Sequence, residues 1–348
     1  MSWNDKKLQA LREQFQDKHG GEFIDENAQR IADHIFSKEG ARQKPWAGLP
    51  TFLDAPYQEL NVENLKQLQV GIVGMPMDLA VSNRPGSRFG PRAVRAIERV
   101  GPYHDGFDTA PLHQMRVADV GDVNFRSRYK LDQSHEDIEQ CINQFVECKT
   151  LPLSVGGDHS ISHPILKALG KSEPVGMIHI DAHADTGGAF DGERFHHGGP
   201  FRNAVLDGVL NPERTIQIGI RGAANYLWEF SKTSGMQVVL AQDMQRMGMD
   251  AIIKLAREIV GNGPTYLSFD IDSLDPAYAP GTGTPEVGGL TNREAITLLR
   301  GLKGLNFIGG DMVEVAPQYD ATTNTAHNGA AMLFEILGLL QFSPALPK

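Results

Sequence analysis

Residues 175–185 read VGMIHIDAHAD, an apolar run that changes abruptly into acids and a histidine. A continuous apolar run is typical of a strand buried on both faces of a parallel sheet. Side chains at every second position of an extended segment point the same way, so Asp181, His183 and Asp185 are expected to project together. His179, earlier in the run, is expected to be a core residue or an outer neighbour that points away from them. Packing alone does not explain such acids, because buried carboxylates without partners are costly.

Similar apolar segments recur along the chain and alternate with helical patterns. We expect strands at VGIVGMP, LPLSVGG, VGMIHID, TIQIGIRG, MQVVLA, TYLSFDID and NFIGGDMVEV. Helical spacing of apolar residues marks HEDIEQCINQFVECK, DAIIKLAREIV and REAITLLRGLK. This alternation predicts an α/β fold with a mostly parallel central sheet that is covered on both faces. In such sheets, ligands bind beyond the carboxyl ends of the strands.

Two other expected strand ends carry the same kinds of residue. GGDHS (156–160) places His159 behind two glycines that allow a sharp turn. LSFDIDSLDP (267–276) places Asp270 and Asp272 on one side of a strand end. Taken alone, GGDHS could be a capped helix start, and DIDSLDP could be a calcium-like loop or a turn. Three such clusters in one sheet have no economical structural explanation, whereas metal ions neutralise carboxylates.

The six residues divide into two sets of four that share two carboxylates. One set is His159, Asp181, Asp185 and Asp270. The other set is Asp181, His183, Asp270 and Asp272. Asp181 and Asp270 would bridge two divalent ions, and oxygen-rich, thiolate-free ligation suits Mn²⁺ or Ni²⁺ better than structural zinc. Two such ions about 3.5–4 Å apart would lower the pKa of a shared water, in a negative pocket that disfavours a phosphate ester.

The composition excludes several classes of protein. A net charge of −10 over 348 residues, without a basic block, argues against nucleic acid and anionic membranes as partners. No apolar run approaches the ~20 residues that span a bilayer, and the N-terminus lacks the apolar core of a signal peptide. Cys141 and Cys148 lie on one expected helix and are expected to be reduced. The expected compartment is the cytoplasm.

Residues 1–68 differ in texture from the rest of the chain. Two amphipathic helical patterns, one over residues 4–18 and one capped by Asp25, come first. ARQKPWAGLPTFLDAPY (41–57) is rich in Pro and Gly and is expected to be extended. This is too little apolar surface for an independent domain. We therefore expect an N-terminal extension that packs on the body or on a neighbouring subunit, followed by a catalytic domain over residues 69–348.

The motifs GGDHS, DAHAD and SFDIDSLDPAYAPGTGTPEVGGL resemble the three signatures of the ureohydrolases, the arginase and agmatinase superfamily. The resemblance covers residues 69–340. It implies an arginase-type three-layer α/β/α fold, a binuclear metal centre with the ligands assigned above, and release of urea from a guanidino group. It also implies a homo-oligomer, either a trimer or a hexamer, or a hetero-oligomer with a related subunit.

Further residues take their roles from the same resemblance. GGDMVEVAP resembles the segment whose Glu hydrogen-bonds the substrate guanidinium, here Glu314. HHGGPFR resembles the loop with the proton-shuttling His, here His197, with His196 as the alternative. Asp185 resembles the acid that passes a proton to the leaving amine. The segment PGTGTP is expected to line the guanidino end through Thr282, Gly283 and Thr284.

The substrate is expected to be a small guanidino compound. The stretch after DAHAD, TGGAFDGER, lacks the Asn and Ser pair that binds the amino-acid head group in arginase. AGLPTFLDAP and HGGPFRNAV resemble guanidinobutyrase and the guanidine and metformin hydrolases. The doubled HHGG and the long N-terminal segment favour guanidine or a biguanide such as metformin as the substrate. The resemblance associates the hydrolases of these two compounds with nickel, and it associates the other branches of the family with manganese. Guanidinobutyrase and agmatinase are the alternatives, and a non-catalytic subunit is a remote one because all six ligands are present.

Overall fold

The computed structural model describes most of the chain, in four stretches: residues 4–35, 46–98, 100–222 and 228–348. The chain forms two compact units that divide between Leu49 and Pro50. In the N-terminal unit, helices α1 (Asp5–Phe15) and α2 (Glu26–Ile35) match the two helical patterns. The Asp25 carboxylate accepts the Ala28 N–H at 2.8 Å, as expected for a cap. Residues 41–45 of the expected extended segment lie outside the described residues.

The C-terminal unit is built on one eight-stranded sheet in which every described pairing is parallel. Its strands are β1 (Val70–Met75), β2 (Val117–Asp122), β3 (Leu151–Gly156), β4 (Val175–Ile180), β5 (Leu210–Ile220), β6 (Gln237–Leu240), β7 (Thr265–Asp270) and β8 (Phe307–Val313). Their order across the sheet is β2-β1-β3-β8-β7-β4-β5-β6. The strand that comes last in the chain therefore lies in the middle of the sheet.

The expected strands are all present, and β2 is an addition at one edge of the sheet. Its sequence, VADVGD, is interrupted by acids that hide the apolar pattern. Asp119 is nevertheless buried, because Arg95 donates to its two carboxylate oxygens at 2.8 and 3.0 Å. A buried ion pair thus replaces the apolar side chain that the sequence pattern requires of a strand.

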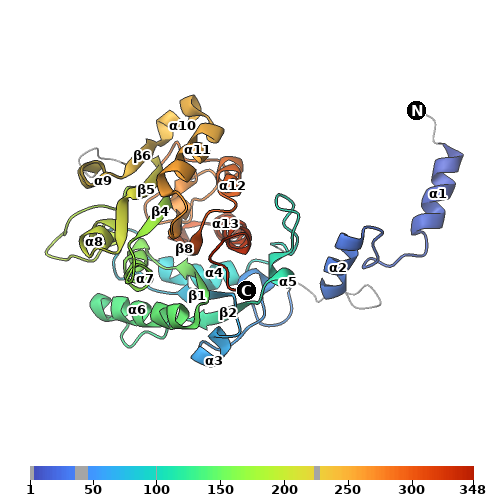
Figure 1. Ribbon diagram of the computed structural model, residues 1–348, viewed down its shortest axis with the longest axis horizontal. Helices are drawn as coiled ribbons and strands as arrows, with labels where there is room; N and C mark the ends of the chain where they lie inside the picture. Colours follow the sequence, from blue (N-terminus) through green and yellow to red (C-terminus); the bar gives the residue numbers. More distant parts are fainter. Residues whose placement is uncertain (1–3, 36–45, 99, 223–227) are drawn as a thin grey trace. The chain divides into compact units, whose positions relative to one another are not determined.

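Helices cover both faces of the sheet and complete three layers (Figure 1). On one face the packed helices are α3 (Val62–Leu65), α6 (Leu131–Cys148), α7 (Ser162–Leu169) and α8 (Pro200–Leu206). On the other face they are α4 (Gly90–Arg95), α11 (Met249–Val260), α12 (Asn292–Gly301) and α13 (Asn324–Gln341). Each layer has its own apolar core against the sheet. The expected three-layer α/β/α arrangement is confirmed.

The remaining elements of this unit are short. The short helices are α5 (Pro111–Gln114), α9 (Glu229–Ser234) and α10 (Ala241–Met247). The 3₁₀ turns include Phe52–Asp54, Ser87–Phe89, His159–Ile161, Ile271–Ser273 and Pro317–Tyr319. One of these turns begins three residues after β3 ends and another directly follows β7, and the metal motifs lie there.

The segment just after the unit boundary belongs to the core of the body. Phe52 and Leu53 are 0% and 3% exposed and pack in the same apolar core as α13. The Phe52 N–H donates to Asp119 at 3.0 Å, and the Arg95 guanidinium lies 3.9 Å from the centre of the Phe52 ring. The body of the fold therefore begins at Pro50, earlier than the start at residue 69 expected from the sequence.

The two cysteines are free, and burial raises the pKa of the Cys141 thiol to about 12. Over the described stretches, no helix combines the length and the apolar character needed to cross a bilayer.

Candidate metal centre and active site

The site lies at the carboxyl ends of the four central strands, which are neighbours in the order β3-β8-β7-β4. His159 begins the 3₁₀ turn after β3, and the DAHAD residues follow β4. Asp270 ends β7, and Glu314 directly follows β8. Residues that are distant in sequence therefore meet at one edge of the sheet, where parallel sheets bind their ligands.

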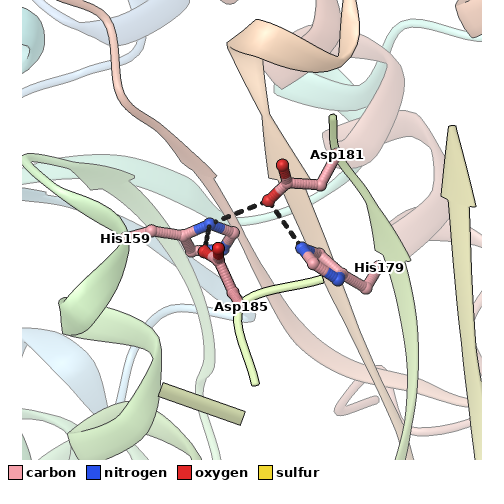
Figure 2. Close-up of side chains that lie close together, drawn as sticks. All are labelled: His159, His179, Asp181 and Asp185. Carbon is pink, nitrogen blue, oxygen red and sulfur yellow. Dashed lines mark hydrogen bonds and ion pairs between the residues drawn. The ribbon is translucent and has the colours of Figure 1, made fainter. Parts of the chain in front are cut away.

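His159 is the centre of the first cluster of side chains (Figure 2). Its Nδ1 lies 2.9 Å from an Asp185 oxygen, 3.1 Å from Asp181 and 3.2 Å from Asp270. Its Nε2 lies 2.8 Å from the Ser268 hydroxyl, which in turn donates to a buried carboxylate in β8. The ring is buried, yet Nδ1 has no hydrogen-bond partner among the described residues. A buried nitrogen that faces three carboxylates and bonds to none fits a cation ligand.

His183 is the centre of a second cluster, which shares Asp181 with the first. Its Nδ1 lies 3.1 Å from an Asp272 oxygen and 3.5 Å from an Asp181 oxygen. Asp272 also accepts a hydrogen bond from the Thr284 hydroxyl at 3.2 Å. The two acids are buried, whereas the histidine side chain is partly exposed.

Potential metal-ligand atoms form two groups, and within each group all of the atoms lie within 4.8 Å of one another. They are His159, His179, Asp181 and Asp185, and, separately, Asp181, His183 and Asp272. Asp181 belongs to both groups, as a bridging residue must. Asp270 belongs to neither group, although it faces His159, so its bridging role stays a prediction.

His179 does not point away from the ligands, and that expectation was wrong. Its Nε2 lies 2.7 Å from an Asp181 oxygen. The physical reason is the two-residue repeat of a strand, which places His179 on the same side as Asp181. The rule that grouped Asp181 with His183 and Asp185 includes His179 as well.

The buried acids are short of positive charge. Burial raises the pKa of Asp270 well above its usual value, and the charges of Asp272 and Asp181 raise it further. Burial also raises the pKa of Asp181, but the surrounding histidines outweigh it and hold that pKa well below its usual value. Across the described residues, no Lys or Arg lies within ion-pair distance of these acids. Two divalent cations would supply the missing charge.

Glu314 and His197 form a pair beside the first cluster. Glu314 Oε1 accepts the His159 N–H at 2.9 Å and lies 3.1 Å from His197 Nδ1. Burial lowers the pKa of His197, but its hydrogen bond to Glu314 and the nearby carboxylates outweigh this and raise it to about 9. Ser82 provides a partner for either protonation state. Its N–H reaches a neutral Nε2 at 3.2 Å, and its hydroxyl, at 2.7 Å, can accept from a protonated one.

His196 holds the neighbouring loop. Its Nε2 lies 2.7 Å from the Gly188 carbonyl oxygen, and its ring packs edge-on against Phe190 with centroids 4.9 Å apart. Phe190 and Glu193 exchange two backbone hydrogen bonds, of 3.1 and 2.7 Å, around an Asp-Gly turn with positive φ at both residues. Of the two adjacent histidines, only His197 reaches Glu314.

Two residues of this site have a strained backbone conformation. Asp185 has a φ of 51° and Glu314 a φ of 65°, a left-handed conformation that costs a non-glycine residue about 1–3 kcal/mol. Glu314 is held there by its N–H bond to the Gly157 carbonyl at 2.9 Å. Gly157 itself has no room for a side chain, since a Cβ would lie 2.1 Å from the Met77 carbonyl oxygen. The second glycine of GGDHS therefore allows the backbones to approach closely.

Residues 68–338 match the sequence model of the Arginase family. The chain belongs to the arginase family. A guanidinopropionase of Pseudomonas aeruginosa is 44% identical over 317 residues, which cover 90% of this chain and 98% of that protein. The mitochondrial agmatinase of Gallus gallus is 46% identical over 281 residues, 78% of this chain and 81% of that protein. The structure of proclavaminate amidino hydrolase from Streptomyces clavuligerus superposes with a TM-score of 0.81 at 33% identity, covering 86% of this chain and 99% of that one.

The arginase-family chain is therefore a metal-dependent ureohydrolase that acts on C–N bonds of guanidino compounds. The structure supplies what such an enzyme requires, which is a cluster of His and Asp side chains able to hold metal beside a pocket.

A cavity of about 600 Å³ opens over both clusters. Its inner wall carries the polar side chains His183, Asp185, His197, Asp270, Asp272, Thr284 and Glu314. Its apolar wall includes Leu79, Val81, Leu131, Phe190, Phe195 and Trp228. Thr284 is the threonine of the PGTGTP segment that lines this cavity. Thr282 is fully buried and is absent from the described residues of the wall, so its expected role at the guanidino end stays a prediction.

Arg221 is a residue that the sequence analysis missed. It follows β5, and its guanidinium donates to the main-chain carbonyls of Asp272, Ser273 and Glu286 at 2.7, 3.3 and 2.8 Å. These bonds hold the loop that carries a metal-ligand candidate and Thr284. A partly buried arginine whose hydrogen bonds go to carbonyls has no acidic partner in the sequence that would reveal it.

Proposed function

We propose that this chain hydrolyses a small guanidino compound without a carboxylate, with guanidine and biguanides such as metformin favoured. The products are urea, or a guanylurea from a biguanide, and an amine or ammonia. The charge of the cavity is the observation that carries the proposal. The described wall contains no Lys or Arg, and it includes the exposed acids Asp191 and Glu193. The carboxylate of a guanidino acid would meet negatively charged side chains at either end of the cavity.

The inner wall provides partners for a guanidinium. Among the described residues, the hydrogen bonds of Glu314 involve Oε1, which leaves Oε2 to accept substrate N–H groups. Divalent cations, Ni²⁺ or Mn²⁺, held by the six ligand candidates would supply Lewis acidity and a nucleophilic water at neutral pH. Asp185 and His197 both line the cavity, where Asp185 would pass a proton to the leaving nitrogen and His197 would exchange a proton with solvent.

The size and apolar wall of the cavity support a substituted guanidine. Guanidine alone would leave most of the 600 Å³ empty. Phe190, Phe195 and Trp228 offer apolar surface to N-methyl groups, whose burial is worth about 0.8 kcal/mol per carbon. Within the proposed class, the cavity therefore favours a biguanide over guanidine itself.

Agmatine is the second candidate, because its cationic tail would be complementary to Asp191 and Glu193. The 46% identity to an agmatinase supports it. The 44% identity to a guanidinopropionase instead points to a guanidino acid as the substrate. Guanidinobutyrase, the other alternative from the sequence, would also act on a guanidino acid. Neither acid finds a Lys or Arg among the described residues that line this cavity.

The test is amine or ammonia release from guanidine, metformin, agmatine, 3-guanidinopropionate and 4-guanidinobutyrate, with enzyme loaded separately with Mn²⁺ and Ni²⁺. We expect kcat/KM for both guanidino acids to fall below that of the best substrate by about 100-fold or more, because an unpaired charge is rejected strongly. A guanidino acid as the best substrate would overturn the proposal.

A charge substitution at Glu193 tests the same argument from the protein side. Glu193→Arg should raise kcat/KM for 4-guanidinobutyrate and lower it for agmatine. Glu193→Gln is the matched control, which should lower agmatine turnover without creating activity on the acid. Equal behaviour of the two variants would show that the charge of this wall does not select the substrate.

A further inference from the structure

His179 is a fully buried histidine that the proposed mechanism does not use. Its Nε2 lies 2.7 Å from Asp181 Oδ2, and its Nδ1 lies 3.1 Å from the side-chain nitrogen of Gln217. Gln217 is its register partner in the β4–β5 ladder and is also fully buried. The His179 ring packs against Phe201 with centroids 4.4 Å apart. Figure 2 shows the Asp181 carboxylate between the rings of His159 and His179.

The Gln217 amide fixes which nitrogen of His179 carries the hydrogen. Gln217 Nε2 lies 2.5 Å from the Ala184 carbonyl oxygen, where a second oxygen would be repelled, so a donor must stand there. The same nitrogen donates to His179 Nδ1, which must therefore offer its lone pair. A neutral imidazole then has its hydrogen on Nε2. Because that hydrogen points to Asp181, His179 is a donor to the metal cluster and not one of its ligands.

The Asp181 carboxylate receives one hydrogen bond on each oxygen. The His183 N–H donates to Oδ1 at 2.6 Å, and His179 donates to Oδ2 at 2.7 Å. An ionised carboxylate has about four lone-pair positions, so each oxygen keeps capacity for a cation. Oδ2 lies 3.1 Å from His159 Nδ1, and Oδ1 lies 3.5 Å from His183 Nδ1. One oxygen is thus presented to each cluster.

We propose that Gln217 and His179 form a positioning pair that holds Asp181 as the bridge between two divalent cations. The pair acts through Asp181 and does not contact the cavity that takes the substrate. The inference rests on the metal centre of the proposed function and deepens it. Outer hydrogen bonds of this kind commonly change metal affinity by about 10–100-fold.

The test measures Mn²⁺ binding to the metal-free full-length protein by calorimetry and elemental analysis. His179→Met removes the donor and keeps an apolar side chain, and we expect Mn²⁺ affinity to fall by about 10–100-fold. His179→Gln returns an N–H near the position of Nε2. The Mn²⁺ affinity of this variant should stay within about threefold of that of the parent protein, which is much less than the loss expected for His179→Met. Gln217→Met should lower the affinity in the same direction as His179→Met.

A matched control is His163, a buried histidine outside the site whose Nε2 lies 2.8 Å from Asp207. His163→Met should lower thermal stability without changing Mn²⁺ affinity. Equal losses in His179→Met and His179→Gln would make His179 a ligand and overturn the pair. Parent-like affinity in His179→Met would also overturn it.

A measurement on the unaltered protein keeps the test independent of folding defects. Proton–nitrogen correlation spectra of the metal-free protein with ¹⁵N-labelled histidine should show the His179 hydrogen on Nε2. A hydrogen on Nδ1 would overturn the inference. A parent chain that binds neither Mn²⁺ nor Ni²⁺ would refute the metal centre itself, whereas normal parent binding with an unaffected His179→Met would refute the pair alone.

Discussion

His196 and His197 are neighbours in sequence, yet their rings have separate partners. His197 lies between Glu314 and Ser82, whereas His196 bonds to the Gly188 carbonyl. The sequence motif predicts His197 as the catalytic residue, with His196 as the alternative. The contacts that distinguish the two rings come from Glu314 and from Ser82, which reaches the site from the loop after β1, and HHGG does not contain them.

His197→Ala should leave the metal content intact and lower kcat by about 10²–10⁴-fold, as for other general acid–base residues. The reason is that its contacts, Glu314 and Ser82, are not metal-ligand candidates. Elemental analysis beside steady-state kinetics checks both parts. Loss of metal from this variant, or a larger loss of kcat in His196→Ala, would contradict the assignment.

Asp270→Asn should lose at least one metal ion and nearly all activity, because it removes one of four carboxylates from the centre. The metal-free variant should nevertheless melt no lower than the metal-free parent at pH 7. An acid whose pKa is raised in the folded state destabilises the fold above its unfolded pKa, and Asp270 is such an acid. Calorimetry with and without Mn²⁺ separates the two effects. Two ions retained in an active variant would refute the bridging role.

Strand ends were the most predictable elements of this fold, and loops were the least. The two-residue repeat placed Asp181, His183 and Asp185 together from sequence alone, and a strict use of it would have added His179. The acids of β2 concealed a strand because their partner, Arg95, lies on a separate helix. The wall formed by Phe190 depends on an Asp-Gly hairpin whose position over the pocket no pattern encodes.

Arg221→Lys should loosen the loop that follows β7. A lysine cannot reproduce the several carbonyl bonds of the planar guanidinium, and we expect a loss of about 2 kcal/mol in unfolding free energy. Mn²⁺ affinity should also fall, because Asp272 lies on this loop. Arg214→Lys is the matched control, since Arg214 bonds to the Val260 and Pro264 carbonyls away from the site. It should lower stability alone, and equal Mn²⁺ affinity in both variants would refute the role of Arg221.

The chain as a whole consists of a body that starts at Pro50 and an N-terminal unit with little buried surface of its own. Large apolar side chains of that unit are exposed, namely Leu11, Phe15, Phe23, Ile24, Trp46 and Leu49. Composition alone indicated that this region is not an independent domain. The sequence left open whether Phe52 and Leu53 pack on the body or on a neighbouring subunit, because their core partners lie far along the chain.

Deletion of residues 1–49 should leave a folded body that binds both metal ions, and it should weaken assembly by removing exposed apolar side chains. Deletion to residue 57 should in addition cost about 3–5 kcal/mol, since it removes the buried Phe52 ring. Light scattering, metal analysis and thermal melting of the two truncated proteins check these outcomes. Unchanged assembly and substrate selectivity after the shorter deletion would mean that the segment only covers surface.

The central place of β8 also determines when a newly made chain can complete its metal centre. β8 bonds to β3 on one side and to β7 on the other, and no described ladder joins β3 to β7 directly. During synthesis the groups β2-β1-β3 and β7-β4-β5-β6 leave the ribosome first, with His159 on one group and Asp181 on the other. His159 can join the carboxylates of the first cluster only when β8 emerges and closes the gap, whereas Asp181, His183 and Asp272 already share one group of strands. A chain that ends before Phe307 should therefore lack a complete first cluster and should bind fewer metal ions than the full chain.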